Sequence, residues 1–272
     1  MRFAVFLLVC AGFASAQDPR ALVARAVAAD DHSDRLARDY TYKVRDEISA
    51  LDSKGNVQAV HSTVDEVLYI GGRRYFDPLE KDGKPIPAAQ QRKEQAKLDR
   101  AAREATRMSE AERTKRLQEA EQDRARRRAD FKDIPDAFDF KLLGDDTIDG
   151  RPAYKIQATP RPAWRGKLHA VLNNIEGTLW IDKQDFIWVK FEADVLNPFY
   201  LGLFLARVDK GTHISYEMQH INNELWVPKQ VTLTASARFA LVKKVNVGQK
   251  VTFTDYRRFQ TDSRIVATPD SP

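Results

Sequence analysis

The chain has 272 residues, with 44 Lys and Arg, 39 Asp and Glu and a formal net charge of +5 at pH 7. A chain of this length can build its own core, and a single cysteine, Cys10, excludes a disulfide framework. Between positions 80 and 130 there are 15 Lys and Arg against 11 Asp and Glu. The basic excess therefore lies in one mixed-charge segment, which argues against nucleic acid as a partner.

The N-terminus has the three parts of a secretory signal peptide. A basic start is followed by an apolar run that is too short to span a bilayer and by the sequence Ala14-Ser15-Ala16. This order predicts cleavage after Ala16, an exported protein and a mature chain that begins at Gln17. Lipidation at Cys10 is the alternative, and Val9 disfavours it because a small residue is expected there.

The first elements of the mature chain are a helix and a long hairpin. Asp18-Pro19 is typical of an N-cap followed by proline at the first helical position, and apolar residues then recur at helical spacing, which predicts a helix over 19–37. From Tyr40 the period changes to two. The turn at 53–56 then leads into a second strand that ends near Gly71-Gly72.

A charged helical insertion is predicted over 80–131. Ser109 followed by Glu112 is a capping-box signature, so we expect two helices, at about 88–107 and 110–130. Their apolar stripe is thin, which favours exposed or loosely docked helices. A membrane-facing or partner-facing arm is the alternative, in which anionic headgroups meet a cluster of basic residues: Arg124, Arg126, Arg127 and Arg128.

After Pro135 the pattern is almost entirely strand and turn. Asp149-Gly150 predicts a hairpin, Lys183-Gln184-Asp185 joins two more strands, and further strands run over 212–220 and 225–235. The last two are expected at 241–247 and 251–259 with Gly248 between them, before a flexible tail at 261–272. The fold class is mainly β (α+β): a curved antiparallel sheet with one apolar and one polar face, in a single domain over 17–272.

Motifs for catalysis or metal binding are absent from the sequence. The five histidines have no metal-ligand spacing, and no serine lies in a G-x-S-x-G context. Asp182 and Asp185 are the remaining candidates for a carboxylate-dependent hydrolase, although aspartate is also favoured at a tight turn for its hydrogen bonds to the backbone. We expect a protein that is not an enzyme, with no metal and no cofactor.

An unbroken apolar run over 198–205 lies between two ordinary alternating strands. Such a run is typical of a strand covered on both faces, or of a surface that meets a ligand. With nearby aromatic residues it predicts the wall of an acyl-chain cavity, lined by Trp180, Trp188, Phe199, Tyr200, Leu203, Phe204, Tyr216, Met218 and Trp226.

The order of elements, with Gly-Thr-Leu-Trp-Ile-Asp at 177–182 and Asn-Glu-Leu-Trp-Val-Pro-Lys at 223–229, resembles the periplasmic LolA/LolB-like outer-membrane lipoprotein-sorting proteins. The likeness covers most of 19–78 and 136–260. It implies an unclosed β-barrel with a helical lid, a periplasmic location, and a non-catalytic carrier of lipid or lipoprotein acyl chains. A periplasmic sensor or interaction module that binds a partner protein is the alternative.

Overall fold

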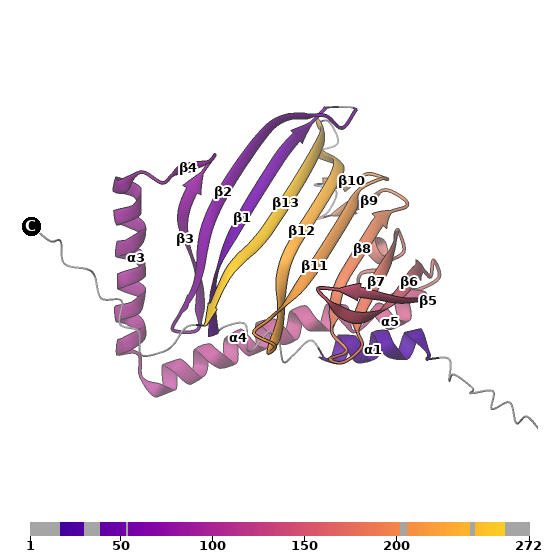
Figure 1. The fold of residues 1–272 in the computed structure, drawn as a ribbon, viewed down its shortest axis with the longest axis horizontal. Coiled ribbons are helices and arrows are strands. Elements are labelled where there is room, and N and C mark those ends of the chain that lie inside the picture. The colour runs from indigo at the N-terminus through magenta and orange to yellow at the C-terminus, as the bar shows by residue number, and fades with distance from the viewer. Residues whose placement is uncertain (1–16, 30–38, 53, 202–205, 240–242, 259–272) are drawn as a thin grey trace, which may run out of the picture.

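The protein is built on one antiparallel sheet, seen as a curved array of strands in Figure 1. The computed structural model describes residues 17–29, 39–52, 54–201, 206–239 and 243–258. The thirteen described strands lie in the order β4-β3-β2-β1-β13-β12-β11-β8-β7-β6-β5, and β10 and β9 extend beside β12. They are β1 (Tyr40–Leu51), β2 (Val57–Ile70), β3 (Arg73–Lys81), β4 (Lys84–Pro85), β5 (Phe138–Ile148), β6 (Arg151–Pro160), β7 (Ile175–Asp182), β8 (Trp188–Val195), β9 (Phe199–Leu201), β10 (Ala206–Val208), β11 (His213–Ile221), β12 (Leu225–Phe239) and β13 (Lys243–Arg258). This confirms the predicted fold class.

Helix α1 (Pro19–Ala29) begins as predicted. The Asp18 carboxylate accepts a hydrogen bond from the Arg20 N–H at 3.0 Å, and proline occupies the first helical position. The described helix ends at Ala29, and residues 30–38 lie outside the described chain. Residues 1–16 and the 261–272 tail lie outside it too, so the signal peptide and the flexible tail stay predictions.

The charged arm consists of α3 (Ala88–Arg107) and α4 (Glu110–Phe131), with both halves of the predicted capping box formed at Ser109 and Glu112. Helix α3 packs against β3 and buries Leu98 and Ala101. No α4 side chain that the structure describes is buried. The thin apolar stripe therefore docks one helix of the arm and leaves the other exposed.

Helix α4 leads from the β2–β3 turn toward α5 (Ile134–Ala137), which packs against α1 (Figure 1). Helix α4 has 22 residues, which span about 33 Å at 1.5 Å per residue. The arm thus links one edge of the sheet to the helices at the other.

The predicted tight hairpins are present. Asp149 and Gly150 have φ of 50° and 77°, as a two-residue turn between directly paired Ile148 and Arg151 requires. Gly71 and Gly72 also have positive φ, but they join β2 to β3, a strand that the sequence pattern did not indicate. Strand β3 carries charged residues on both sides and a proline, so it has no period-two alternation.

The prediction of two last strands separated at Gly248 is wrong. The structure has one continuous strand, β13, in which Gly248 pairs with Ser49 on one side and Thr234 on the other. Glycine is tolerated inside this strand because its neighbours supply the pairing, and its φ is not positive. Phe239 of β12 pairs with Lys243 at the start of β13, and the pairing continues through Gly248.

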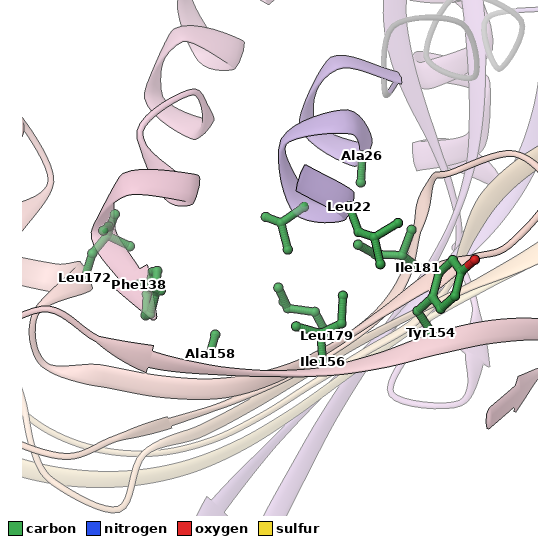
Figure 2. Close-up of a cluster of buried hydrophobic side chains, with 11 residues drawn as sticks. Leu22, Ala26, Phe138, Tyr154, Ile156, Ala158, Leu172, Leu179 and Ile181 are labelled. Atoms are coloured by element: carbon green, nitrogen blue, oxygen red, sulfur yellow. The ribbon is translucent and has the colours of Figure 1, made fainter. Parts of the chain in front are cut away.

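The main hydrophobic core lies between the sheet and its helices. Figure 2 shows Leu22 and Ala26 of α1 directed toward Ile156, Leu179 and Ile181 of the sheet. Leu172 of α6 (His169–Leu172) completes this cluster beside Phe138. The core thus covers one face of the sheet at its β5–β7 end.

Candidate functional site

A continuous row of apolar side chains crosses one face of the sheet. Directly opposed residues of antiparallel strands share a face, and the register links neighbour to neighbour along this row: Val251, Val231, Tyr216, Phe191, Leu179, Ile156 and Leu142. A second, parallel row joins Leu233, Ile214, Ala193, Gly177 and Ala158. We call this surface the apolar face. It passes from β13 to β5 without a charged side chain in either row.

Among the described residues, one end of the apolar face is fully covered. Leu179 and Ile156 are buried beneath α1 in the main core. Toward β1 the side chains become partly exposed, and we call this region the open part of the apolar face: Tyr42, Val44, Ile214, Tyr216, Val231, Leu233, Val251 and Phe253. The apolar face therefore extends beyond the main core.

Aromatic rings lie at two places in the open part. Tyr42 stacks on Tyr256 with ring centroids 5.0 Å apart, and Phe191 stacks on Tyr216 at 5.4 Å. The Tyr256 hydroxyl donates a hydrogen bond to the Pro228 carbonyl at 2.7 Å. Burial raises the pKa of Tyr256 far above its ordinary value, so this phenol stays neutral.

Two carboxylates adjoin the open part on β1 and β2. Asp46 lies directly opposite Val251 and accepts hydrogen bonds from Gln249 at 2.9 and 3.0 Å. Asp65 lies directly opposite Val44, and burial raises its pKa, with the Asp46 charge as a lesser contribution in the same direction. Two acidic side chains thus lie beside the apolar surface, which continues from Tyr42 to Val67 of β2.

The structure divides the sequence-predicted lining residues. Tyr216 lies in the open part of the apolar face, whereas Trp188 packs half-buried against the main core. Three others are buried together in a second cluster: Trp180, Met218 and Trp226. Phe199 is buried and Tyr200 is exposed on β9. Leu203 and Phe204 lie outside the described residues.

Trp180 lies on the opposite side of β7 from the main core, since it alternates with Leu179 and Ile181, and Tyr216 also packs against the second cluster. The Trp180 indole donates to Asp146 at 2.8 Å, and the Trp226 indole donates to Asp185 at 3.1 Å. These tryptophans are packed and hydrogen-bonded, so they form structural contacts between hairpins.

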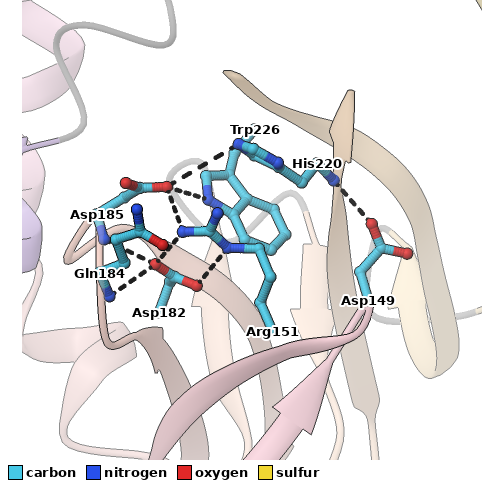
Figure 3. A network of polar contacts seen from close by, with 7 residues as sticks. All are labelled: Asp149, Arg151, Asp182, Gln184, Asp185, His220 and Trp226. Carbon is cyan, nitrogen blue, oxygen red and sulfur yellow. Dashed lines mark hydrogen bonds and ion pairs between the residues drawn. The ribbon is translucent and has the colours of Figure 1, made fainter. Parts of the chain in front are cut away.

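The carboxylates of the β7–β8 turn are held by ionic and hydrogen bonds (Figure 3). Arg151 donates to both oxygens of Asp182, at 2.9 and 2.8 Å, and to Asp185 at 2.8 Å. Asp182 also accepts the backbone N–H groups of Gln184 and Asp185. Burial alone would raise the pKa of Asp182, but Arg151 and these N–H groups hold it below its ordinary value.

A carboxylate with this set of donors is a poor general acid or nucleophile, because its charge is already neutralised and its oxygens are engaged. The described histidines do not add a reactive pair: His213 contacts Asp194 at 2.8 Å, and the His220 ring lies tilted against Trp226 with centroids 5.1 Å apart. No group of three or more His, Cys, Asp or Glu within the described residues could hold a metal ion.

Of the four arginines predicted to contact a membrane or partner, Arg126 is exposed on α4. Arg124, Arg127 and Arg128 lie on the same helix, and their side chains are outside the described part. Among the helices that the structure describes, none combines the length and apolar character needed to cross a bilayer.

Most residues of the open part, including Val44, Leu233 and Val251, are not among the predicted lining residues. Their signal is present in the sequence as period-two alternation in three strands. Alternation does not say which faces of different strands meet, so large aromatic residues and the run at 198–205 are the stronger signals in the sequence alone.

Comparison with known proteins finds similarity among solved structures. No family model and no curated protein matches the chain. Among solved structures, a domain described as an outer-membrane lipoprotein-sorting protein from Vibrio parahaemolyticus is similar, with a TM-score of 0.35 and 10% identity over 91% of this chain and 94% of that chain. A DUF1329 family protein from Desulfovibrio piger has a TM-score of 0.35 and 13% identity over 91% and 95% of the two chains. A LolA superfamily protein from Nitrosomonas europaea has a TM-score of 0.30 and 11% identity over 89% and 93%.

Proposed function

We propose that this protein is a non-catalytic periplasmic carrier that binds acyl chains of lipids or lipoproteins on the open part of its apolar face. The observation that supports this most is the continuation of one apolar face past the main core, onto strands whose side chains stay partly exposed. An apolar surface of this kind is typical of a ligand or partner site.

The size of the surface fits an extended hydrocarbon chain. From β1 to β11 the open part crosses β13 and β12, which gives about 14 Å at about 4.8 Å per strand. One leaflet of a bilayer is about 15 Å deep, half of a core of about 30 Å. Most of a single acyl chain can therefore lie across the strands within the surface.

The energy of the transfer supports a carrier. Exposure of a chain of about 16 carbons to water costs on the order of 10 kcal/mol at about 0.8 kcal/mol per methylene. A protein that covers one side of the chain with valine, leucine and aromatic side chains lowers that cost without any chemical step. The engaged state of Asp182 and Arg151 is consistent with a protein that binds and does not catalyse.

The arm supports a second candidate function, binding of a partner protein or a membrane surface. Leu117 and Phe131 of α4 are 55% and 52% exposed, so this helix presents two large apolar side chains at its surface. In this function the arm would make the contact, with its arginines near anionic groups. Saturation of binding by protein, and not by lipid, would favour this candidate.

A matched pair of variants on β12 tests the carrier. Leu233 lies on the apolar face, and the next residue, Thr234, is exposed on the other face. We expect Leu233→Asp to weaken binding of a fluorescent long-chain fatty acid by at least about tenfold, a difference of about 1.4 kcal/mol, and Thr234→Asp to leave it within about twofold.

Thermal unfolding of both variants shows whether they remain folded. If Leu233→Asp does not fold, Leu233→Ala is used in its place. Equal binding by the variants of both faces, or no saturable binding by the wild type, would contradict the proposed carrier function.

A further inference from the structure

A cavity lies on the polar face of the sheet, opposite the open part of the apolar face. It has a volume of about 320 Å³ and is formed by side chains of β1, β2, β3 and β13. Val64, Arg45 and Thr252 lie directly opposite one another in register, so they share this face. Val64 is 7% exposed. Ligand cavities begin at about 300 Å³, so the volume suits a small molecule.

Two of the cations that line the cavity are already paired. The Arg45 guanidinium lies 3.2 Å from the Glu80 carboxylate, across the strand that carries Val64. The Lys43 ammonium lies 2.7 Å from Asp255. These contacts fix the positions of both cations and leave the cavity wall close to neutral.

Glu47 and Lys250 also line the cavity, from directly opposed positions on β1 and β13. Opposite charges so placed are within reach of an ion pair, yet neither side chain has an ion pair or side-chain hydrogen bond within the described residues. One carboxylate and one ammonium therefore border the same cavity, each with free hydrogen-bonding capacity. Thr252 lies on the same side of β13, between Lys250 and Thr254, and also lines the cavity.

We propose that this cavity binds a small zwitterion, whose anionic group contacts Lys250 and the Thr252 hydroxyl and whose ammonium contacts Glu47. A simple anion of the same size would meet the Glu47 carboxylate, and a simple cation would meet the Lys250 ammonium. Only a ligand that carries both charges satisfies both side chains. The site is on the opposite face from the acyl-chain surface, so it does not depend on the carrier function.

The anionic group can be phosphoryl or carboxylate, and the zwitterion can be a free molecule or a lipid headgroup. Calorimetric titration of the full mature chain with O-phosphoethanolamine and with γ-aminobutyrate covers the two anionic groups. Phosphate alone and ethanolamine alone, which each carry one of the two charges, serve as the half-ligands. Vesicles of phosphatidylethanolamine, with phosphatidylcholine vesicles as reference, test the headgroup as the source.

We expect at least one zwitterion, free or in a vesicle, to bind saturably and more tightly than either half-ligand. Loss of one charge-assisted contact is expected to weaken binding about tenfold, in Lys250→Ala and in Glu47→Gln alike. Lys141→Ala is the control, because Lys141 is an exposed lysine of β5, at the other edge of the sheet, and its loss changes the net charge equally.

Exchange of the two charges sharpens the test. Glu47→Lys alone should abolish zwitterion binding. The double variant Glu47→Lys, Lys250→Glu should bind the zwitterion again, with the ligand in the opposite orientation. Absence of binding by both free zwitterions, together with equal binding to the two kinds of vesicle, would overturn the proposal. Equal effects of Lys141→Ala and Lys250→Ala, or no recovery in a folded double variant, would also overturn it.

Discussion

At the scale of single residues, Asp182 connects two hairpins through Arg151. Its side chain is 1% exposed, and it accepts two hydrogen bonds from the guanidinium and two from the backbone of its own turn. Arg151 also reaches Asp185, which in turn accepts the Trp226 indole. The pair therefore stabilises the packing of β6, β7 and β12 at one end of the sheet.

Removal of one partner from this buried pair should be costly. We expect Arg151→Ala to lower the free energy of unfolding by about 3–5 kcal/mol, because Asp182 is left as a buried unpaired charge. Urea unfolding at pH 7 measures it. Asp145→Asn is the control, since Asp145 pairs with Lys183 at an exposed position and should change stability by less than about 1 kcal/mol. Similar losses in both variants would contradict the structural role of Asp182.

The same carboxylate gives a pH dependence of known sign. The pKa of Asp182 in the folded protein lies below its ordinary value of 3.8. Its contribution is therefore complete above the unfolded pKa and is lost as the pH falls through the folded pKa. Between pH 5 and pH 2 the wild type should lose more stability than Asp182→Asn, as followed by urea unfolding. Parallel curves for the two proteins would contradict this assignment.

Two glycines inside strands should respond in opposite ways to an added methyl group. A Cβ at Gly177 would lie 2.5 Å from the Glu192 carbonyl oxygen, whereas the nearest atom to a Cβ at Gly248 is 3.7 Å away. We expect Gly177→Ala to cost about 1–3 kcal/mol through overpacking. Gly248→Ala should be neutral or stabilise the strand by about 0.5 kcal/mol. Thermal unfolding measures the stability of both variants. A larger loss of stability in Gly248→Ala than in Gly177→Ala would contradict this prediction.

At the scale of elements, the two helices of the arm differ in their attachment. Leu98 of α3 is 7% exposed, and Leu117 of α4 is 55% exposed. Leu98→Ala should lower the free energy of unfolding by about 2–5 kcal/mol, and Leu117→Ala by less than about 0.5 kcal/mol. Chemical unfolding measures the stability of both variants, which carry the same leucine-to-alanine substitution in the two helices of the arm. Equal effects would mean that α3 and α4 are attached alike.

Elements defined by local signals could be predicted from the sequence. The Asp18 cap, the capping box at Ser109 and the Asp149-Gly150 turn each set a boundary within a few residues, and the structure has all three. Strand β3 and the unbroken β13 could not be predicted in this way. Their boundaries depend on pairing with strands that are distant in the sequence, and a glycine or a proline does not end a strand that its neighbours hold.

At the scale of the whole molecule, the candidate site arises from register. Val231 fits the alternation of apolar and polar residues along its own strand. Its place in the apolar face follows only from its pairing with Val251 and Tyr216. Aromatic size alone does not identify this surface, because Trp180 and Trp226 are buried in the second cluster and donate hydrogen bonds to Asp146 and Asp185. Individual apolar positions could thus be predicted, and the surface that they form together could not.

Export is a property of the whole chain and has a direct test. Because Ala14-Ser15-Ala16 fits signal peptidase, the protein recovered from the periplasmic fraction should have the intact mass of residues 17–272. Mass spectrometry of the purified protein measures this. A lipidated species that begins at Cys10 would show that the N-terminus is processed as a lipoprotein.

The central claim, that acyl chains lie on the open part of the apolar face, is tested most directly by photo-crosslinking. A long-chain fatty acid with a diazirine in its chain is bound to the mature protein and irradiated, and the labelled residues are mapped by mass spectrometry. We expect adducts on β13, β12 and β11 at apolar-face residues such as Val251, Val231 and Tyr216, with competition by unlabelled fatty acid. Labelling of the polar-face neighbours Thr232 and Thr252 to the same extent, or labelling that unlabelled fatty acid does not reduce, would contradict the account.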